Sequence, residues 1–195
     1  MTASVCHKNG AAPGSRPPGP ALVALAALML VIAMKIRSES PGPVIYAQNR
    51  VGKDGRVFRL FKFRSMYVDA ESRGARWAGG EDRRITPFGR FMRKTRVDEI
   101  PQLWNIVKGN MSLVGPRPER PVFCREFEKR IHGWRYRTHV TPGLTGLAQV
   151  MGGYELLPRE KVKLDLAYIR HRGIRTDTRV LLRTIGVITT GSGAR

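Results

Sequence analysis

The stretch RITPFGRFMRKTRVDEIPQLWNIVKGNMSLVGPRPE, residues 84–119, contains the strongest indications of fold in this sequence. Apolar residues recur at helical spacing in its first part, which predicts a basic amphipathic helix over residues 86–96. A second helix is predicted to begin near Asp98 and to end at Gly109, because glycine commonly follows the last turn of a helix. The apolar stripe of this second helix consists of Leu103, Ile106 and Val107.

On either side of this stretch the sequence predicts strands and further helices, and therefore an α+β domain. Residues 43–66 alternate between apolar and polar types and predict a β-hairpin with its turn at 52–55. Residues 67–84 are polar, without a clear period, and are expected to form a loop. A Gly- and Pro-containing loop is expected at 141–153. The downstream helices are predicted at residues 119–131, 157–171 and 176–189.

Composition restricts the class of protein. The chain has 195 residues, of which 42% are apolar, so it is long enough and apolar enough to bury the core of one domain. Lys and Arg number 35 against 15 Asp and Glu, and the net charge of +20 predicts a polyanionic partner. Nucleic acid, an acidic lipid surface and phosphorylated substrates all fit that charge. Only Cys6 and Cys124 are present, which excludes a disulfide framework and a Cys-x-x-Cys metal site.

The N-terminal part differs from the rest. Residues 1–20 are rich in small residues and proline and are expected to be a disordered leader. Residues 21–34 form an apolar run that, as a helix, spans about 21 Å, less than the roughly 30 Å hydrocarbon core of a bilayer. A secretory signal and a buried core helix are alternatives. We favour a segment, residues 21–37, that enters the bilayer without crossing it and precedes a catalytic domain over residues 38–195.

The acidic pair Asp98-Glu99 is the best candidate for chemistry, because it directly follows a run of basic residues. One carboxylate could attack phosphorus and form an acyl phosphate, and the other could help to hold Mg²⁺. Arg93 would neutralise charge on the transferred group. The competing interpretation is that Asp98 simply caps the helix that is predicted to begin there.

The chain resembles the bacterial sugar transferase family, the monotopic phosphoglycosyl transferases. The motifs that carry the likeness are KFRSM at 62–66, the stretch 84–119 and PGLTGLAQV at 142–150, and the resemblance covers about residues 38–190. It implies a transfer of sugar-1-phosphate from a UDP-sugar to undecaprenyl phosphate, with release of UMP. This reaction begins exopolysaccharide, O-antigen or capsule assembly. The expected location is the cytoplasmic face of the bacterial inner membrane.

The resemblance also implies roles for individual residues. Asp98 matches the nucleophile, which forms a covalent phosphoryl-aspartate, and Glu99 matches the acid that assists with the Mg²⁺ cofactor. The basic positions expected to bind substrate phosphates or the nucleotide are Lys62, Arg64, Arg93 and Arg117. The implied partners are a UDP-sugar, undecaprenyl phosphate and an anionic membrane surface. A homo-oligomer is left open, and no nucleic acid is expected.

The sequence departs from the family pattern in three places. Family members usually begin with an apolar helix that enters and leaves the same membrane face, and only its returning half matches residues 21–37. Met151-Gly152-Gly153 replaces an Asn-Gly-Arg-like sequence, and Gly173 replaces a common serine. An inactive relative that binds polyprenyl phosphate or a partner is therefore kept as an alternative. A basic nucleic-acid-binding protein is the more remote one.

Overall fold

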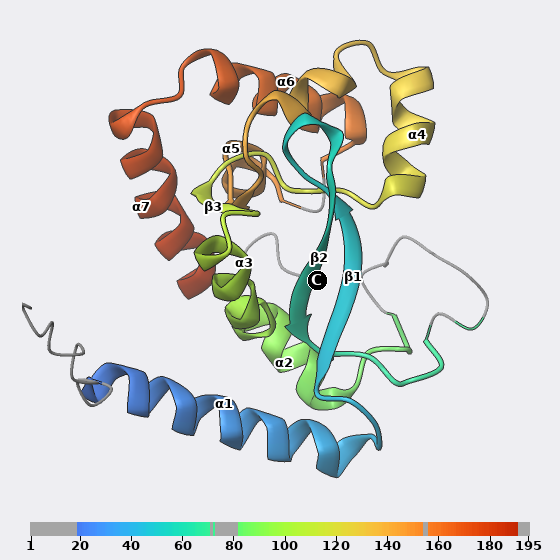
Figure 1. Cartoon of the computed structure of the whole chain (residues 1–195), viewed down its shortest axis with the longest axis vertical. Coiled ribbons are helices and arrows are strands. Elements are labelled where there is room, and N and C mark those ends of the chain that lie inside the picture. The colour runs from blue at the N-terminus through green and yellow to red at the C-terminus, as the bar shows by residue number, and fades with distance from the viewer. Residues whose placement is uncertain (1–18, 71, 73–81, 154–155, 191–195) are drawn as a thin grey trace, which may run out of the picture. The chain divides into compact units, whose positions relative to one another are not determined.

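The structure is a computed structural model, and it describes residues 19–70, 72, 82–153 and 156–190. Its α-helices are α1 (Pro20–Glu39), α2 (Pro87–Thr95), α3 (Leu103–Val107), α4 (Pro121–Arg130), α5 (Leu147–Met151), α6 (Pro158–Arg170) and α7 (Ile174–Thr190) (Figure 1). The strands are β1 (Ile45–Val51), β2 (Val57–Phe63), β3 (Ser112–Val114) and β4 (Gly143–Thr145). Short 3-10 helices occur at η1 (Lys53–Gly55), η2 (Val97–Gln102) and η3 (Trp134–His139). This mixture of helices and small sheets confirms the predicted α+β class.

The chain divides into two compact units, residues 1–32 and 33–195, and the boundary lies inside α1. Residues 1–18 of the predicted leader lie outside the described residues. Among the described residues, none of the helices combines the length and apolar character that a membrane crossing requires. The predicted membrane-entering role of residues 21–37 and the predicted domain boundary after Arg37 stay predictions.

The hairpin over β1 and β2 is confirmed in the predicted place. The strands pair antiparallel, from Ile45 opposite Phe63 to Val51 opposite Val57. The turn takes left-handed backbone at Asp54 (φ 54°) and Gly55 (φ 77°), which these two residue types tolerate well. In Figure 1 the hairpin runs between α4, which contacts β1, and the η2–α3 segment, which contacts β2.

Helix α2 is confirmed as well, and local chemistry explains where it begins. The Thr86 Oγ1 accepts a hydrogen bond from the Gly89 N–H at 2.9 Å, and Pro87 occupies the first turn, where its missing N–H costs nothing. The helix ends at Thr95, and the C-cap residue Arg96 has left-handed backbone with φ 59°. This reversal turns the chain into η2.

The predicted second helix needs correction. Residues 97–102 form the 3-10 helix η2, and only Leu103–Val107 are α-helical. Pro101 lies inside η2, where its missing N–H and its ring oppose a regular α-helix. The N-cap position of η2 is Arg96, so the interpretation of Asp98 as a helix cap is wrong. Gly109, with φ 73°, follows the helix as predicted.

The side of α3 that faces the hairpin is polar, contrary to its predicted apolar stripe. Of the predicted stripe, Leu103 and Val107 are 40% and 76% exposed and Ile106 is half-buried. Asn105, in contrast, is fully buried. The Asn105 amide donates to the Arg59 carbonyl at 2.8 Å and accepts from the Phe61 N–H at 3.1 Å. These bonds satisfy backbone groups of β2 that a neighbouring strand would otherwise bind.

The downstream helices α4, α6 and α7 lie at the predicted positions within a few residues. The predicted loop at 141–153 is partly regular, because β4 pairs parallel with β3 and α5 follows directly. Of the predicted loop at 67–84, residues 67–70, 72 and 82–84 contain no helix or strand, and the others lie outside the described residues. Tyr168 joins α6 to α7, because its hydroxyl donates a hydrogen bond to the Asp177 Oδ1 at 2.9 Å.

Gly89 allows the first turn of α2 to pack directly on the backbone of Ser65. A Cβ at this position would collide with the Ser65 carbonyl group, which is backbone and yields little. We expect Gly89→Ala to lower the free energy of unfolding by about 2 kcal/mol in urea denaturation, the middle of the range for overpacking. Gly186→Ala in α7, where nothing lies within 4 Å of the added Cβ, should instead raise it by about 0.5–1 kcal/mol. Equal stability of Gly89→Ala and the natural protein would contradict this close packing.

Candidate active site

A pocket of about 270 Å³ lies beside the hairpin and η2, and all of the predicted site residues line it. These are Lys62, Arg64, Arg93, Asp98, Glu99 and Arg117. They come from β2 and the residues after it, from α2, from η2 and from the segment before α4. Residues far apart in sequence therefore meet in one cavity, and the role of each stays a prediction.

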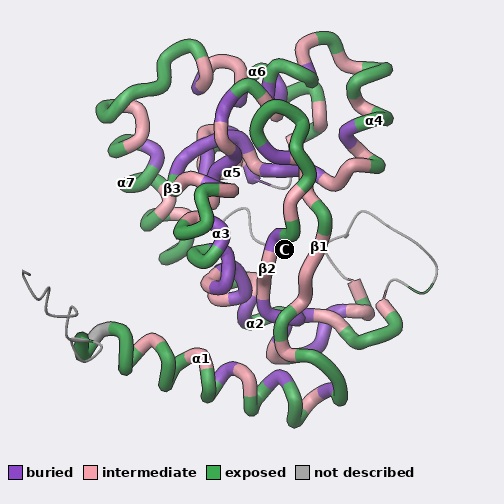
Figure 2. Tube along the Cα trace, viewed as in Figure 1, coloured by how far each residue is buried: buried purple, intermediate pink, exposed green. Residues whose placement is uncertain are grey.

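The acidic pair is buried at the floor of this arrangement. Asp98 and Glu99 are 6% and 8% exposed, and both lie on η2, which packs against β2. In Figure 2 the stretch between α2 and α3 contains much buried chain. Because two neighbouring carboxylates in a desolvated site are costly, their cationic partners decide how each one is charged.

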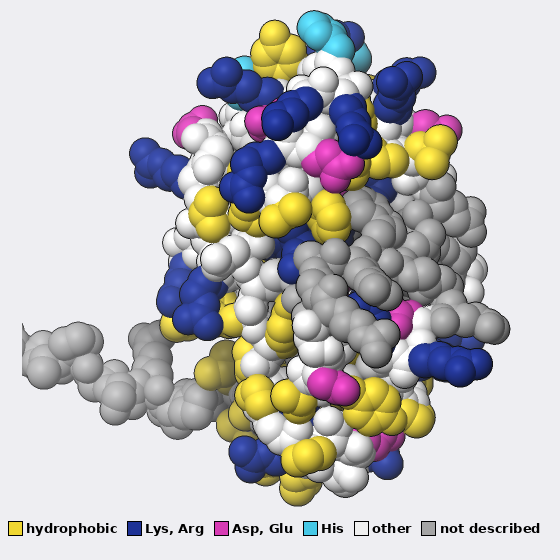
Figure 3. Space-filling view, turned by 90° about the vertical axis from the view of Figure 1, so that its right-hand side faces the viewer, with side chains coloured by type: hydrophobic (Ala, Val, Ile, Leu, Met, Phe, Trp, Pro, Cys, Tyr) yellow, Lys and Arg dark blue, Asp and Glu magenta, His cyan; other side chains and the backbone are white. Residues whose placement is uncertain are grey.

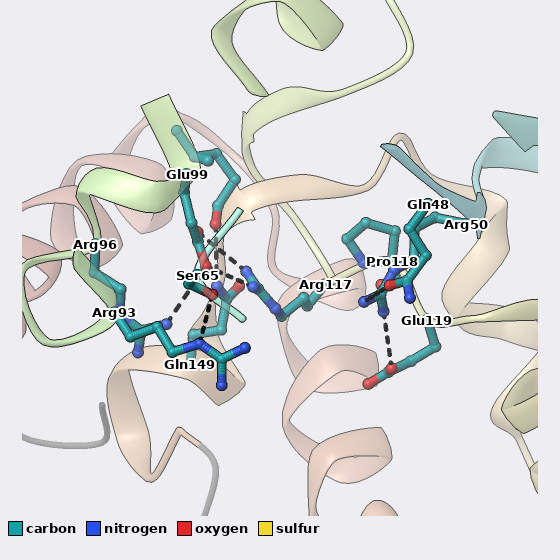
Figure 4. A network of polar contacts seen from close by, with 11 residues as sticks. Gln48, Arg50, Ser65, Arg93, Arg96, Glu99, Arg117, Pro118, Glu119 and Gln149 are labelled. Atoms are coloured by element: carbon teal, nitrogen blue, oxygen red, sulfur yellow. Dashed lines mark hydrogen bonds and ion pairs between the residues drawn. The ribbon is translucent and has the colours of Figure 1, made fainter. Parts of the chain in front are cut away.

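Glu99 is held as an anion by two arginines. Arg117 binds it with both terminal nitrogens, Nη2 to Oε1 at 2.6 Å and Nη1 to Oε2 at 3.3 Å (Figure 4). The Arg96 Nη1 lies 3.6 Å from the same Oε1. Burial by itself would raise the pKa of Glu99, but the charge and hydrogen bonds of Arg117, together with the charges of Arg96 and Lys62, keep that pKa below its ordinary value.

The pKa of Asp98 shifts in the opposite direction. Burial, and next the charge of Glu99, raise the pKa of Asp98 to about 6, against the smaller opposing effects of Lys62 and Arg93. Among the described residues, the Asp98 Oδ1 is buried without a hydrogen-bond partner. A carboxylate oxygen of this kind is poorly solvated and therefore more nucleophilic than one in water.

Lys62 is the cation on the hairpin that acts on Asp98. Burial lowers the pKa of Lys62 to about 8, although the Asp98 charge partly compensates. The Lys62 Nζ also lies 5.5 Å from the ring centre of Tyr46, its cross-strand neighbour. At neutral pH this lysine is charged and adjoins the acidic pair.

The two remaining predicted cations, Arg93 and Arg64, bind different groups. The Arg93 Nε donates to the Ser65 Oγ at 2.9 Å, so Ser65 orients this guanidinium at the pocket. The Arg64 guanidinium instead donates to the backbone carbonyls of Pro41, at 2.9 Å, and Ser40. Arg64 therefore anchors the chain that follows α1, and its predicted phosphate-binding role stays a prediction.

Sequence reasoning missed several other residues of the pocket lining. They include Tyr46, Gln48, Arg50, Glu119 and Phe123. The predicted hairpin contained a signal for part of this set, because residues 46, 48 and 50 alternate and must share one face of β1. No local pattern indicated that Glu119, beyond the Pro-Arg-Pro motif, would join them.

The acidic pair suits magnesium better than zinc. Among residues 19–70, 72, 82–153 and 156–190, no group of three or more His, Cys, Asp or Glu is close enough to hold a metal ion. Mg²⁺ requires less from the protein, typically one or two carboxylates, because substrate phosphates and water complete its shell. Glu99, with the unpartnered Asp98 Oδ1 beside it, fits that donor set.

Comparison with known proteins gives bacterial relatives that match most of this chain. The chain is 46% identical over 171 residues to a UDP-N-acetylgalactosamine-undecaprenyl-phosphate N-acetylgalactosaminephosphotransferase of Aeromonas hydrophila, covering 86% of this chain and 40% of that protein. It is 52% identical over 120 residues to a putative undecaprenyl-phosphate N-acetylgalactosaminyl 1-phosphate transferase of Bacillus subtilis, covering 60% of this chain and 67% of the relative. A UDP-glucose:undecaprenyl-phosphate glucose-1-phosphate transferase of Escherichia coli is 36% identical over 169 residues, which are 84% of this chain and 36% of the relative.

Two of these relatives are named for N-acetylgalactosamine and the third for glucose, and two of them are more than twice as long as the matched part. The profile of the bacterial sugar transferases matches residues 19–191, nearly the whole sequence. With its acidic pair, basic pocket and extensive sequence match, the chain belongs to the bacterial sugar transferase family.

Proposed function

We propose that this protein transfers sugar-1-phosphate from a UDP-sugar to undecaprenyl phosphate and releases UMP, through a phosphoryl-aspartate formed on Asp98. The observation that carries the proposal is the buried Asp98 carboxylate, with its Oδ1 unpartnered, in a pocket lined by basic side chains. The names of the relatives supply the substrate classes. The reaction would begin the assembly of a surface polysaccharide.

In the first step the Asp98 Oδ1 attacks the phosphorus that carries the sugar. A P–O bond forms to the carboxylate, the P–O bond to UMP breaks, and UMP leaves with the electron pair. Arg93 lies near enough to influence the charge of Asp98, so it is suited to neutralise the non-bridging phosphate oxygens. Glu99 stays ionised because Arg117 holds it in place.

In the second step a phosphate oxygen of undecaprenyl phosphate attacks the same phosphorus. The new P–O bond gives the polyprenyl diphosphate sugar, and the acyl phosphate bond breaks to restore the Asp98 carboxylate. The raised pKa of Asp98 helps the first step, because a more basic carboxylate is more nucleophilic, whereas in the second step this carboxylate is still a competent leaving group from an acyl phosphate. Lys62 balances the charge of the carboxylate as it forms again.

Magnesium is the proposed cofactor, with Glu99 as its principal protein ligand. When bound, Mg²⁺ supplies charge neutralisation at the diphosphate and at the departing UMP. Arg117 donates to both oxygens of Glu99 and so fixes the orientation of this carboxylate. Each carboxylate oxygen has a second lone-pair direction, so Glu99 can accept these bonds and still serve as a ligand.

We place the reaction at the cytoplasmic face of the bacterial inner membrane. The acceptor is a lipid, the chain has a net charge of +20, and anionic lipids attract such a surface. Figure 3 views one side of the molecule, where the Lys and Arg side chains are more abundant than the acidic ones. The full chain should co-sediment with vesicles that contain phosphatidylglycerol, and less of it should co-sediment with vesicles of pure phosphatidylcholine. Added salt should weaken the binding to the anionic vesicles.

The central experiment measures UMP release with undecaprenyl phosphate and a panel of UDP-sugars. UDP-N-acetylgalactosamine is the first donor to test, because the relatives of Aeromonas hydrophila and Bacillus subtilis are named for that sugar. We expect release of UMP and a labelled lipid product that both depend on Mg²⁺. Binding of undecaprenyl phosphate without turnover of any donor would instead support the inactive relative.

The pH profile tests the charge states of the site. Asp98 must be ionised to attack, so protonation below its pKa of about 6 should lower kcat/KM about tenfold per pH unit. Lys62 loses its charge above its pKa of about 8, which should lower the rate on the alkaline side. We therefore expect a bell-shaped profile with its maximum between these values. In Lys62→Arg the alkaline limb should move to higher pH while the acid limb stays, and an unmoved alkaline limb would contradict the assignment.

A further inference from the structure

A second polar cluster lines the same pocket and has no role in the two steps above. It consists of Tyr46, Gln48, Arg50 and Glu119. In Figure 4, Glu99 and Arg93 lie on one side of Arg117, whereas Gln48, Arg50 and Glu119 lie on the other. The pocket therefore extends from the acidic pair to a separate wall formed by β1 and the residue after Pro118.

Hydrogen bonds hold this wall rigidly. The Arg50 Nη2 donates to the Gln48 Oε1 at 2.6 Å, and the Gln48 Nε2 donates to the Tyr46 hydroxyl at 2.9 Å. The Arg50 Nη1 donates to the Pro118 carbonyl at 3.0 Å and lies 3.5 Å from the Glu119 Oε2. The Val51 N–H also donates to the Glu119 carbonyl at 2.9 Å, which ties this segment to the end of β1.

The chemistry of the wall matches a hydroxyl-rich ring. A sugar offers each hydroxyl as donor and acceptor, and carboxylate, amide and guanidinium groups bind such hydroxyls with strong directionality. The ring of Phe123 also lines the pocket and offers a flat apolar surface, which suits the C–H face of a pyranose. Pro43, Met66 and Val68 of the lining are apolar, whereas further polar groups of the lining, such as Tyr67 and Lys161, do not belong to this hydrogen-bonded wall.

The geometry of phosphoryl transfer favours the same position for the sugar. In an in-line displacement the leaving UMP lies opposite the attacking Asp98 oxygen, so the sugar oxygen must point sideways from phosphorus. The β1 wall lines the same pocket as Asp98, and its Tyr46 is opposite Lys62, which acts on Asp98. We propose that Tyr46, Gln48, Arg50 and Glu119 form the subsite for the hexose of the UDP-sugar and discriminate among sugars, an inference that rests on the proposed function.

The test separates recognition of the sugar from recognition of UMP. For the natural protein, Glu119→Gln and Tyr46→Phe, kcat/KM is measured with UDP-N-acetylgalactosamine, UDP-N-acetylglucosamine, UDP-galactose and UDP-glucose, alongside inhibition by UMP. We expect Glu119→Gln to lower kcat/KM for the best donor about 10–100-fold and to change the ratio between epimeric donors, with the inhibition constant of UMP within about twofold. Tyr46→Phe, which removes only a hydroxyl, should show the same pattern to a smaller extent. Glu126→Gln, on the exposed face of α4, is the matched control and should leave all values unchanged.

Two outcomes of the kinetic test would overturn the inference, and a third transfers the test to calorimetry. If UMP inhibition weakens in parallel with kcat/KM and donor ratios stay constant, the wall binds the nucleotide instead of the sugar. If neither quantity changes in either variant, the wall binds no part of the donor. If the natural protein turns over no donor, the proposed function fails, and the subsite is then judged by calorimetry. It survives only if Glu119→Gln weakens binding of the UDP-sugar more than binding of UDP.

Discussion

Replacing Asp98 by asparagine should lower kcat/KM for sugar-phosphate transfer by at least about 10³-fold, because the amide cannot form the acyl phosphate. The measurement is UMP release in the presence and absence of undecaprenyl phosphate. Without acceptor, the natural protein should release about one equivalent of UMP and keep a labelled sugar phosphate on the chain. Asp98→Asn should release none and carry no label.

Stability distinguishes a chemical defect from a folding defect in this variant. Burial raises the pKa of Asp98 to about 6, so above that pH the ionised carboxylate opposes folding, and this cost vanishes as the pH falls towards the unfolded value. Asparagine removes the charge, so Asp98→Asn should be at least as stable as the natural protein at pH 8. Asp54→Asn is the control, since residue 54 is exposed in the hairpin turn with φ 54°, which asparagine also tolerates. Activity close to the natural level in Asp98→Asn would exclude this residue as the nucleophile.

Arg117→Met should have the second largest effect, because it removes the cation that holds Glu99. We expect kcat/KM to fall about 10²–10³-fold, as when a charge-stabilising group is lost. Of the ion-pair partners of Glu99 in the described part of the chain, Arg96 at 3.6 Å would remain, and the pKa of Glu99 should rise. Arg117→Lys retains the charge without the double hydrogen bond and should recover part of the activity. Steady-state kinetics over a range of Mg²⁺ concentrations measures both effects.

Arg117→Met should also destabilise the protein in a pH-dependent way. We expect a loss of about 2 kcal/mol at pH 7.5, less than for a fully buried ion pair because the Arg117 side chain is 26% exposed. The pKa of Glu99 is lowered in the folded protein, so its stabilising contribution is present above the unfolded pKa and is lost on acidification through the lower folded one. The stabilities of Arg117→Met and the natural protein should therefore converge in acid.

Arg130→Met supplies the matched control for Arg117→Met. Arg130 pairs with Glu126 at 3.0 Å on the surface of α4, where the two side chains are 73% and 44% exposed. Such a pair contributes at most about 0.5 kcal/mol to the free energy of unfolding, so its loss should change stability in urea very little. If Arg117→Met were as harmless as Arg130→Met, Glu99 would not depend on its arginine.

Much of the fold could be predicted because its signals are local. The alternation of residues 43–66, the Asp54-Gly55 turn and the Thr86-Pro87 start of α2 each act within a few residues, so they appear in the sequence and in the structure alike. Where a contact between residues far apart in sequence decides the local structure, the sequence-based prediction was wrong. The side of α3 next to the hairpin is polar because Asn105 binds the backbone of β2, a demand that no periodicity expresses.

The sequence alone determined the chemical groups of the site. Scarce acids beside many cations selected Asp98, Glu99 and Arg93, and family motifs added Lys62, Arg64 and Arg117. Only the tertiary structure decided how these groups are used. It pairs Arg117 with Glu99, turns Arg64 to the chain after α1, and brings Glu119 to the face of β1. The physical reason is that charge and hydrogen bonding depend on distances of a few ångströms between residues that are far apart in sequence, and those distances are set by packing.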